Sequence, residues 1–116
     1  MTALERQTEY KRIVNGKAKI VIGPRSALFV PFKNLGLIII DEEHDSSYIS
    51  QTTPKYNTRE VATRLAYLNN ANLVLGSATP DVCTMYKAME EKIDYYSMLT
   101  RPGDSAIPEV EIVDIK

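Results

Sequence analysis

The chain has 116 residues, a mass of 13.1 kDa and a formal net charge of −1, with 44% hydrophobic and 25% charged residues. It is long enough for one domain with one core, and it is not a polycation built to coat nucleic acid. The single cysteine, Cys83, excludes an internal disulfide and a cysteine-cluster zinc site, and its neighbours Val82 and Tyr86 favour a small core residue over a nucleophile. No apolar run approaches the ~20 residues of a membrane span and no signal-peptide core is visible, so we expect a cytosolic protein.

Charge is distributed unevenly along the chain. Residues 1–33 carry seven Lys or Arg against two Glu, a balance of +5, whereas residues 34–116 carry seven against thirteen acids, a balance of −6. The basic first third can present a local phosphate-binding face even though the whole chain is nearly neutral.

The first expected element is a polar surface helix. Thr2-Ala-Leu-Glu5 has the form of a capping box, and the helix should run to Val14 and end at Asn15-Gly16. Its apolar stripe is thin and consists of Leu4, Tyr10, Ile13 and Val14. A helix with so little apolar surface should lie on the outside of the protein.

A short buried strand is expected over Lys19–Ile22, followed at Gly23 by a turn into a short helix with Pro24 at its first position. The backbone N–H groups at that helix start, the hydroxyl of Ser26 and the guanidinium of Arg25 would together suit a phosphate. The alternative is a plain strand-to-helix connection with a solvated arginine.

The central strand is expected over Leu37–Ile40, where four branched residues in a row indicate a strand buried on both faces of a parallel sheet. It stops at Asp41, Glu42, Glu43 and His44, the only histidine. Ligands of open α/β sheets bind beyond the carboxyl ends of the strands, and a carboxylate there is typical of a Mg²⁺ site in nucleotide hydrolases. The alternative is an ordinary acidic loop after a buried strand.

The polar stretch Asp45 to Thr58 is longer than most connections in compact domains. Its Tyr48 and Tyr56, interleaved with polar and basic residues, would suit stacking on unpaired bases, or would equally pin the loop to its own domain. Asn57-Thr-Arg-Glu60 then forms a second capping box that opens a helix. The expected core face of that helix consists of Val61, Leu65 and Leu68.

A third buried strand is expected over Leu73–Leu75, with Gly76-Ser-Ala-Thr-Pro80 as a tight turn able to hydrogen-bond the acidic loop. A helix should follow from Pro80 to about Glu91. Its expected buried side consists of Val82, Tyr86 and Met89, and further strands are expected over Tyr95–Leu99 and Val110–Ile115. Successive βα steps imply right-handed crossovers, so we predict an α/β fold with a three-layer parallel sheet flanked by helices.

Together, strand-Gly-Pro-Arg-Ser, strand-Asp-Glu-Glu-His and strand-Gly-Ser-Ala-Thr resemble a superfamily 2 helicase, and more narrowly the primosomal protein N′ family of bacterial replication-restart DNA helicases. The resemblance spans nearly the whole chain. It is carried by Gly23-Pro-Arg-Ser-Ala-Leu-Phe29, Pro31-Phe32, Asn34-Leu-Gly36, Asp41-Glu-Glu-His-Asp-Ser-Ser-Tyr48, Tyr56, Arg59 and Leu75-Gly-Ser-Ala-Thr-Pro80, and continues in Leu99-Thr-Arg101 and Val113-Asp-Ile-Lys116.

The resemblance implies a role for each matching residue of the ATPase site. Asp41 in motif II, the Walker B box, would hold Mg²⁺ through its water shell, and Glu42 would orient or deprotonate the water that attacks the γ-phosphate of ATP. His44 would act with Ser77 and Thr79 of motif III to couple nucleotide state to DNA grip.

For DNA, the resemblance implies that Arg25 and Ser26 face the backbone, and that Tyr48 to Tyr56 is a loop signalling DNA occupancy to the ATPase site. The implied partners are forked or single-stranded DNA, other primosome proteins and the rest of the helicase chain, and the implied location is the nucleoid region of a bacterial cytoplasm. Pro24 and Ile49 depart from the usual Thr and Lys of the family, and the loop has no tryptophan.

The chain contains no Gly-x-x-x-x-Gly-Lys-[Ser/Thr] run, so it lacks a P-loop. It also lacks the second helicase lobe with its arginine finger, and the zinc-binding cysteines of the family. We therefore expect residues 1–116 to be the C-terminal part of the first RecA-like, ATP-binding lobe without the P-loop strand, and inactive or nearly so alone. Exposed strand edges would favour self-association.

Two other hypotheses remain at this stage. The first is a non-catalytic nucleic-acid-binding or protein-docking module with a RecA-like fold. The second is a metallohydrolase site built from Glu42, Glu43 and His44, which is less favoured because adjacent residues in such a turn point in different directions.

Overall fold

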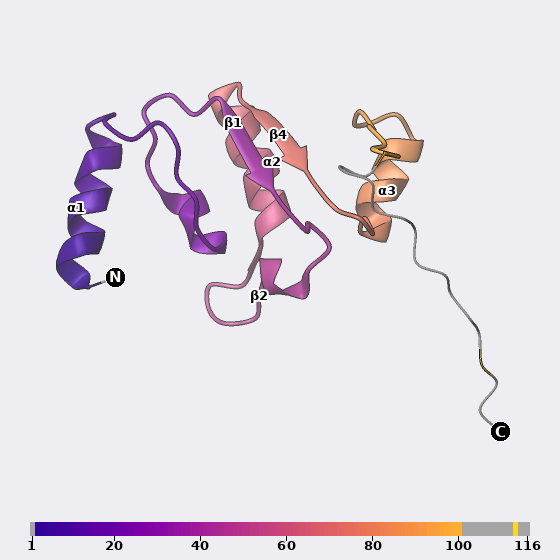
Figure 1. The fold of residues 1–116 in the computed structure, drawn as a ribbon, viewed down its shortest axis with the longest axis horizontal. Helices are drawn as coiled ribbons and strands as arrows, with labels where there is room; N and C mark the ends of the chain where they lie inside the picture. Colours follow the sequence, from indigo (N-terminus) through magenta and orange to yellow (C-terminus); the bar gives the residue numbers. More distant parts are fainter. Residues whose placement is uncertain (1, 101–112, 114–116) are drawn as a thin grey trace.

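The computed structural model describes residues 2–100 and 113 (Figure 1). The elements occur in the order α1 (Ala3–Val14), η1 (Arg25–Phe29), β1 (Leu37–Ile40), η2 (Ser46–Tyr48), β2 (Ile49–Ser50), β3 (Tyr56–Asn57), α2 (Thr58–Asn69), β4 (Asn72–Leu75) and α3 (Val82–Met89), where η marks a 3-10 helix. Helices and a small parallel sheet place the described chain in the predicted α/β class. Within this part of the chain, no helix is both long and apolar enough to cross a bilayer.

Helix α1 forms as predicted. The N–H of Glu5 donates to Thr2 Oγ1 at 3.3 Å and the N–H of Thr2 donates to Glu5 Oε2 at 2.7 Å, which completes the capping box. The helix is capped at Asn15, and Gly16 follows with a φ of +71°, a conformation that favours glycine. Ile13 is its one buried residue, and α1 lies apart from the sheet in Figure 1, as a surface helix would.

The predicted strand over Lys19–Ile22 does not form. Ile20 is 80% exposed and Ile22 is 94% exposed, so the expected burial is also wrong. A strand needs a partner for its N–H and C=O groups, and within the described residues the parallel sheet consists of β1 and β4 alone. The short helix η1 follows as predicted, but with Pro24 as its N-cap residue and not at its first helical position.

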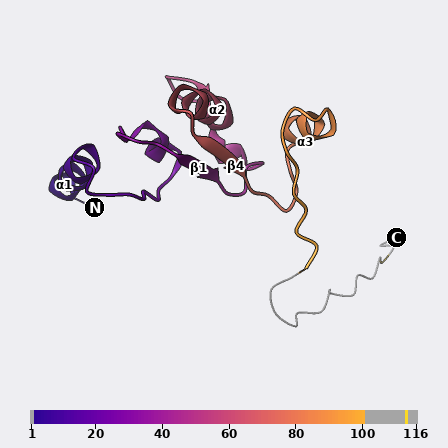
Figure 2. The same ribbon diagram turned by 90° about the horizontal axis from the view of Figure 1, so that it is seen from above.

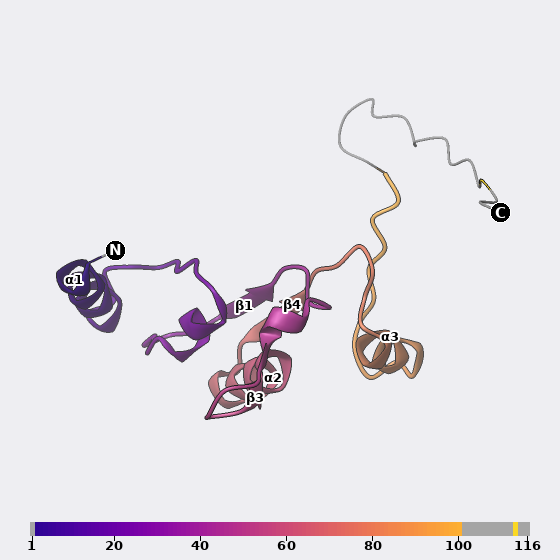
Figure 3. The same ribbon diagram turned by 90° about the horizontal axis from the view of Figure 1, so that it is seen from below.

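Strands β1 and β4 pair in parallel, with Leu37 opposite Asn72 and Ile40 opposite Leu75. The predicted position of both strands and their parallel direction are confirmed. The two-sided burial is wrong, because Ile38 and Ile40 are buried whereas Leu37 is 50% and Ile39 is 65% exposed. Helix α2 covers one face of the sheet (Figures 2 and 3), so the described residues form two layers and not the three that were expected.

Helix α2 uses small residues to approach the sheet. Ala62 is fully buried and Ala66 is 5% exposed, and both pack with Ile38 and Ile40 in the core cluster. The predicted core face is therefore wrong in part. Leu65 packs at the margin of the cluster and Val61 is half-buried, but Leu68 is 64% exposed. An alanine face lets the helix backbone come close to bulky isoleucines, which places the apolar contact one residue away from the expected stripe.

The start of α2 lies at the predicted Asn57, whose Oδ1 accepts the N–H of Arg59 at 2.9 Å. This is a one-sided cap, and the reciprocal contact from Glu60 that a capping box requires is not formed. The helix ends at Asn70, whose φ of 51° lies in the left-handed region common at helix ends.

The stretch from Asp45 to Thr58 folds on the chain itself. Strands β2 and β3 form an antiparallel hairpin, and Thr58 Oγ1 donates to the carbonyl of Tyr48 at 2.7 Å. The ring of Tyr56 lies edge-on to Phe29 with ring centroids 5.2 Å apart. The two tyrosines thus pin the loop to its own domain, one of the two expected roles, and base stacking stays a prediction.

Helix α3 differs from its prediction in burial. Its expected buried side is exposed, with Val82 at 82%, Tyr86 at 57% and Met89 at 73%, because no described element covers it. Cys83 is exposed too, so its assignment to the core is wrong. Residues 95–99 form no strand, and the strand expected over residues 110–115 lies outside the described residues except for Val113.

Candidate functional site

The parallel pairing of β1 and β4 brings the turns that follow them together. The N–H of Gly76 donates to the carbonyl of Ile40 at 2.8 Å, and the N–H of Glu43 donates to the carbonyl of Gly76 at 3.0 Å. A Cβ on Gly76 would lie 3.4 Å from Asp41 Oδ1, so this glycine leaves room for the carboxylate. The sequence-predicted contact between the small-residue turn and the acidic loop is therefore confirmed as geometry.

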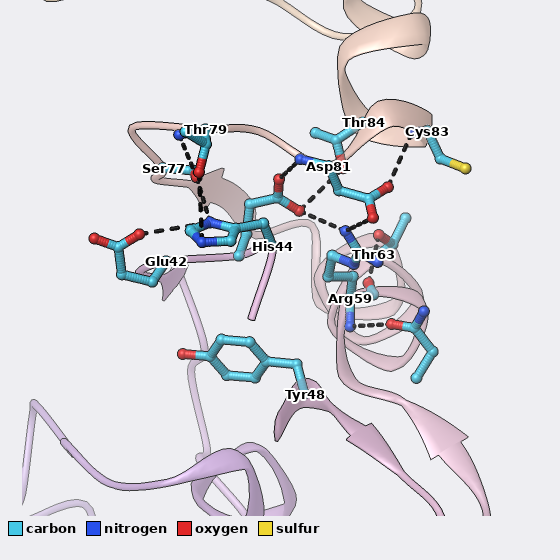
Figure 4. A network of polar contacts seen from close by, with 12 residues as sticks. Glu42, His44, Tyr48, Arg59, Thr63, Ser77, Thr79, Asp81, Cys83 and Thr84 are labelled. Atoms are coloured by element: carbon cyan, nitrogen blue, oxygen red, sulfur yellow. Dashed lines mark hydrogen bonds and ion pairs between the residues drawn. The ribbon is translucent and has the colours of Figure 1, made fainter. Parts of the chain in front are cut away.

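His44 joins the two turns through its ring (Figure 4). Its Nδ1 lies 2.6 Å from Ser77 Oγ and its Nε2 lies 3.5 Å from Thr79 Oγ1. Ser77 Oγ also accepts the N–H of Thr79 at 3.0 Å. The carboxylate of Glu42 approaches the same ring, with Oε2 3.5 Å from Nδ1. The structure therefore brings together four of the sequence-predicted site residues from two turns.

Asp41 and Glu42 lie on the outside of the turn after β1. Asp41 Oδ1 accepts the N–H of Glu42 at 3.0 Å, and the hydroxyl of Tyr48 donates to the carbonyl of Asp41 at 2.8 Å. Glu42 has a φ of 48°, in the left-handed region. Exposed carboxylates keep their water, which suits a Mg²⁺ ion held through its hydration shell.

The donor set for a metal is small. Within the described residues, no group of three or more His, Cys, Asp or Glu side chains is arranged to hold an ion. A single exposed carboxylate such as Asp41 is compatible with the predicted outer-sphere Mg²⁺ contact, because such an ion takes most of its ligands from water and substrate phosphates. The same result gives no support to a metal held by Glu42, Glu43 and His44.

Glu43 is the residue that the sequence reasoning misplaced. It is 1% exposed and its carboxylate accepts three hydrogen bonds. Oε1 accepts the N–H of Asp81 at 2.6 Å, and Oε2 accepts Arg59 Nη1 at 2.7 Å and the hydroxyl of Thr84 at 3.1 Å. Burial alone would raise the pKa of Glu43, but these three donors hold it below its ordinary value.

Arg59 completes this network from the first turn of α2. Its Nη1 also lies 3.3 Å from Asp81 Oδ2, so one guanidinium is shared by two carboxylates (Figure 4). Burial would lower the pKa of Arg59, yet the two acids raise it above its ordinary value. The pKa of Asp81 is lowered despite its own burial, by the N–H of Cys83 and by Arg59.

Strand alternation explains why Glu43 was missed. Ile38 and Ile40 point inward, so continued alternation would turn Glu42 inward and Glu43 outward. The left-handed backbone at Glu42 breaks the alternation and exchanges the two carboxylates. An available signal was Arg59, a cation two residues after the N-cap residue Asn57 of the following helix.

The residues predicted to face DNA do not form one cluster. Arg25 and Ser26 lie on η1 and Tyr56 lies in β3, whereas Tyr48 at the end of η2 reaches the turn after β1. Arg25 Nη1 donates to the carbonyl of Ser47 at 2.6 Å and lies 3.4 Å from that of Ile49. Ser26 is exposed on the same short helix. A shallow surface depression of about 420 Å³ lies at the hairpin and is lined by Ile49, Ser50, Gln51, Lys55 and Tyr56.

Comparison with known proteins finds close similarity along the chain. The chain is 40% identical over 112 residues to the replication restart protein PriA of Bacillus subtilis, which covers 97% of the chain. It is 40% identical over 115 residues to PriA of Rickettsia felis, and 42% identical over 117 residues to PriA of Synechocystis. Nearly the whole chain is thus similar to one part of PriA. The resemblance predicted from the sequence is thereby confirmed.

The chain spans a small part of these PriA proteins, 14% of the length of the Bacillus subtilis and Synechocystis proteins and 18% of the Rickettsia felis protein. No family model matches the chain. The names of these relatives place those proteins in replication restart, and the roles expected of individual residues of this chain stay predictions.

Proposed function

We propose that the chain supplies the motif II and motif III part of the ATPase site of a superfamily 2 DNA helicase of replication restart, within a RecA-like lobe. The observation that carries this proposal is the contact of His44 with Ser77 across the ends of β1 and β4. Residues far apart in sequence meet there at 2.6 Å, next to two exposed carboxylates. Such a contact would link a nucleotide site at the turn after β1 to the turn after β4.

Each residue has a distinct part in this proposal. Asp41 would hold Mg²⁺ through water, and Glu42 would orient or deprotonate the attacking water. His44 would pass changes at Glu42 to Ser77 and Thr79. Mg²⁺ supplies charge neutralisation on the phosphates of ATP when it is bound. The phosphate-cradling P-loop is not among these 116 residues, so the chain alone is expected to be inactive or nearly so.

The proposed macromolecular partner is forked or single-stranded DNA. The proposed contact consists of Arg25 and Ser26 on η1, Tyr48 at the end of η2 and Tyr56 in β3. Other primosome proteins and the remainder of a helicase chain are further proposed partners, in the bacterial cytoplasm. The helicase family implies zinc in another part of such a protein. Zinc is not proposed for this segment, because one cysteine cannot form a cysteine cluster.

The decisive experiment substitutes Asp41→Asn and Glu42→Gln in the complete gene product that carries this chain. We expect ATP hydrolysis to fall on the order of a hundredfold or more, because both groups act on the reacting phosphate, while DNA binding is retained. Glu9→Gln is the matched control, since Glu9 pairs with Arg12 on the exposed surface of α1.

The absence of a P-loop from the sequence favours one alternative, a module that binds nucleic acid or docks a protein without hydrolysis. The same variants separate the two functions. Unchanged ATP hydrolysis in Asp41→Asn and Glu42→Gln, or no hydrolysis in the unmodified gene product, would overturn the helicase assignment in favour of this module.

A further inference from the structure

Helix α3 is attached to the rest of the chain by polar contacts. It contributes no fully buried residue, and only Met85 and Ala88 among its apolar side chains are half-buried, so apolar packing holds it weakly. Its start is tied down by the bonds that Asp81 N–H and Thr84 Oγ1 donate to Glu43, and by the ion pair between Asp81 and Arg59. The Glu43 carboxylate is therefore the point at which the turn after β1, helix α2 and helix α3 meet.

The neighbours of Glu43 are held at the surface and not in the interior. Glu42 and His44 flank it in the chain and are both exposed, and their side chains approach each other only to 3.5 Å. The ring of His44 has its one short side-chain contact with Ser77, at 2.6 Å. The turn also carries the left-handed backbone of Glu42, a conformation that a glutamate adopts only when its surroundings hold it there. The three bonds to the Glu43 side chain contribute to that constraint, together with the backbone bonds from Glu43 N–H to Gly76 and from Asp45 N–H to Glu42.

We propose that Glu43 is a positioning residue, which holds the turn against α2 and α3 and thereby sets the placement of Glu42 and His44 for hydrolysis. This inference rests on the proposed function and deepens it. Glu43 is buried and accepts donors from the protein on both oxygens, so it acts through its neighbours and not on the nucleotide. Glutamine at this position keeps the size but turns an amide N–H₂ toward a donor, which breaks the network.

The first test needs no nucleotide. The chain has one histidine, so the ring signals of His44 in a nuclear magnetic resonance spectrum are unambiguous. In Glu43→Gln we expect these signals to shift as the contact with Ser77 is lost, while circular dichroism retains the helical signal. The control Glu9→Gln, which removes an exposed carboxylate of the same chemistry, should leave them unchanged.

The result that overturns the proposal is a folded Glu43→Gln chain with unmoved His44 signals. Glu43 would then anchor α3 and nothing more. If Glu43→Gln does not fold, Thr84→Val decides the question, because it removes one of the three donors and keeps the shape of the side chain. We expect a smaller shift of the same signals in this variant, and no shift would also overturn the proposal.

The second test measures ATP hydrolysis by the complete gene product. Glu43→Gln should lower kcat on the order of tenfold to a hundredfold with KM for ATP little changed, because a small misplacement of a catalytic group slows the chemical step. An unchanged kcat per folded molecule would overturn the positioning role while leaving the proposed function intact. No hydrolysis by the unmodified protein would overturn the proposed function, and the His44 signals would still decide whether Glu43 places its neighbours.

Discussion

Two regions of the same small sheet differ in how many of their contacts come from this chain. At the carboxyl ends of β1 and β4, the buried carboxylate of Glu43 has all its donors, and no buried side-chain polar atom in the described residues lacks a partner. On the sheet face away from α2, Leu37, Ile39 and Val74 are 48 to 65% exposed. The chain thus completes its polar contacts internally but leaves part of its apolar surface uncovered.

This difference shows that a polar network can be completed by a few neighbouring segments, whereas an apolar core needs whole layers of structure. The network needs only three short segments. The β1–β4 pairing brings two of them together, and the packing of α2 on the sheet brings the third. Covering both faces of a sheet needs a further layer, which the described residues do not supply. Four predictions test this comparison, in order of decreasing expected effect.

The largest effect is expected at the polar network. Arg59→Met keeps an unbranched side chain but leaves Glu43 and Asp81 without their shared cation, and breaking such a buried pair costs about 3–5 kcal/mol of unfolding free energy. Denaturant unfolding measures it. The control Arg12→Met, in an exposed pair with Glu9, should cost about 0–1 kcal/mol, and equal losses in the two variants would contradict the comparison.

The next effect compares the two faces of β1 directly. Ile40→Ala on the buried face should cost about 2–5 kcal/mol of unfolding free energy, because it opens a cavity against Ala62. Ile39→Ala makes the same chemical change one residue away on the exposed face, where about 0.5 kcal/mol or less is expected. A large loss in Ile39→Ala would show that something covers the outer face in solution.

Acid should weaken the polar network gradually. The pKa values of Glu43 and Asp81 are lowered from the ordinary 4.5 and 3.8, so both carboxylates bind protons more readily in the unfolded chain. Their contribution to stability is complete above those ordinary values and is lost as pH falls through the lower values of the folded chain. The unfolding free energy from pH 7 to pH 3 should therefore decline less steeply in Glu43→Gln, and parallel curves would refute this account.

The smallest effect on stability is expected from Ile39→Lys. This variant is also the most direct test of the sheet face that α2 does not cover. Exposed apolar surface and unpaired strand edges favour self-association, which sedimentation velocity detects across micromolar concentrations. We expect Ile39→Lys to weaken association while the unfolding free energy changes by about 0.5 kcal/mol or less. A monomer at all concentrations in the unmodified chain would count against self-association.

The same contrast explains what the sequence could predict. The strands Leu37–Ile40 and Leu73–Leu75, their parallel direction and the meeting of His44 with Ser77 follow from local pattern and from the rule that such strands end at one edge. The burial of Glu43 depended on one left-handed residue, which no periodicity reveals.

Other predictions failed because a pattern states what a segment can bury, and not what is available to bury it. Val82, Tyr86 and Met89 recur at helical spacing, and Lys19–Ile22 has the residues of a strand, yet no described element covers the one or pairs with the other. The alanine face of α2 was passed over for a similar reason, because alanine gives a weak apolar signal although it allows the closest approach.

At Glu42, the residue that best suits the left-handed backbone differs from the residue that the proposed reaction needs. Asparagine adopts this conformation more readily than glutamate, so Glu42→Asn should fold at least as stably and yet lose the carboxylate proposed to act on water. Selecting variants of this chain for thermal stability alone would therefore favour replacing Glu42, and the most stable variants would be the least active.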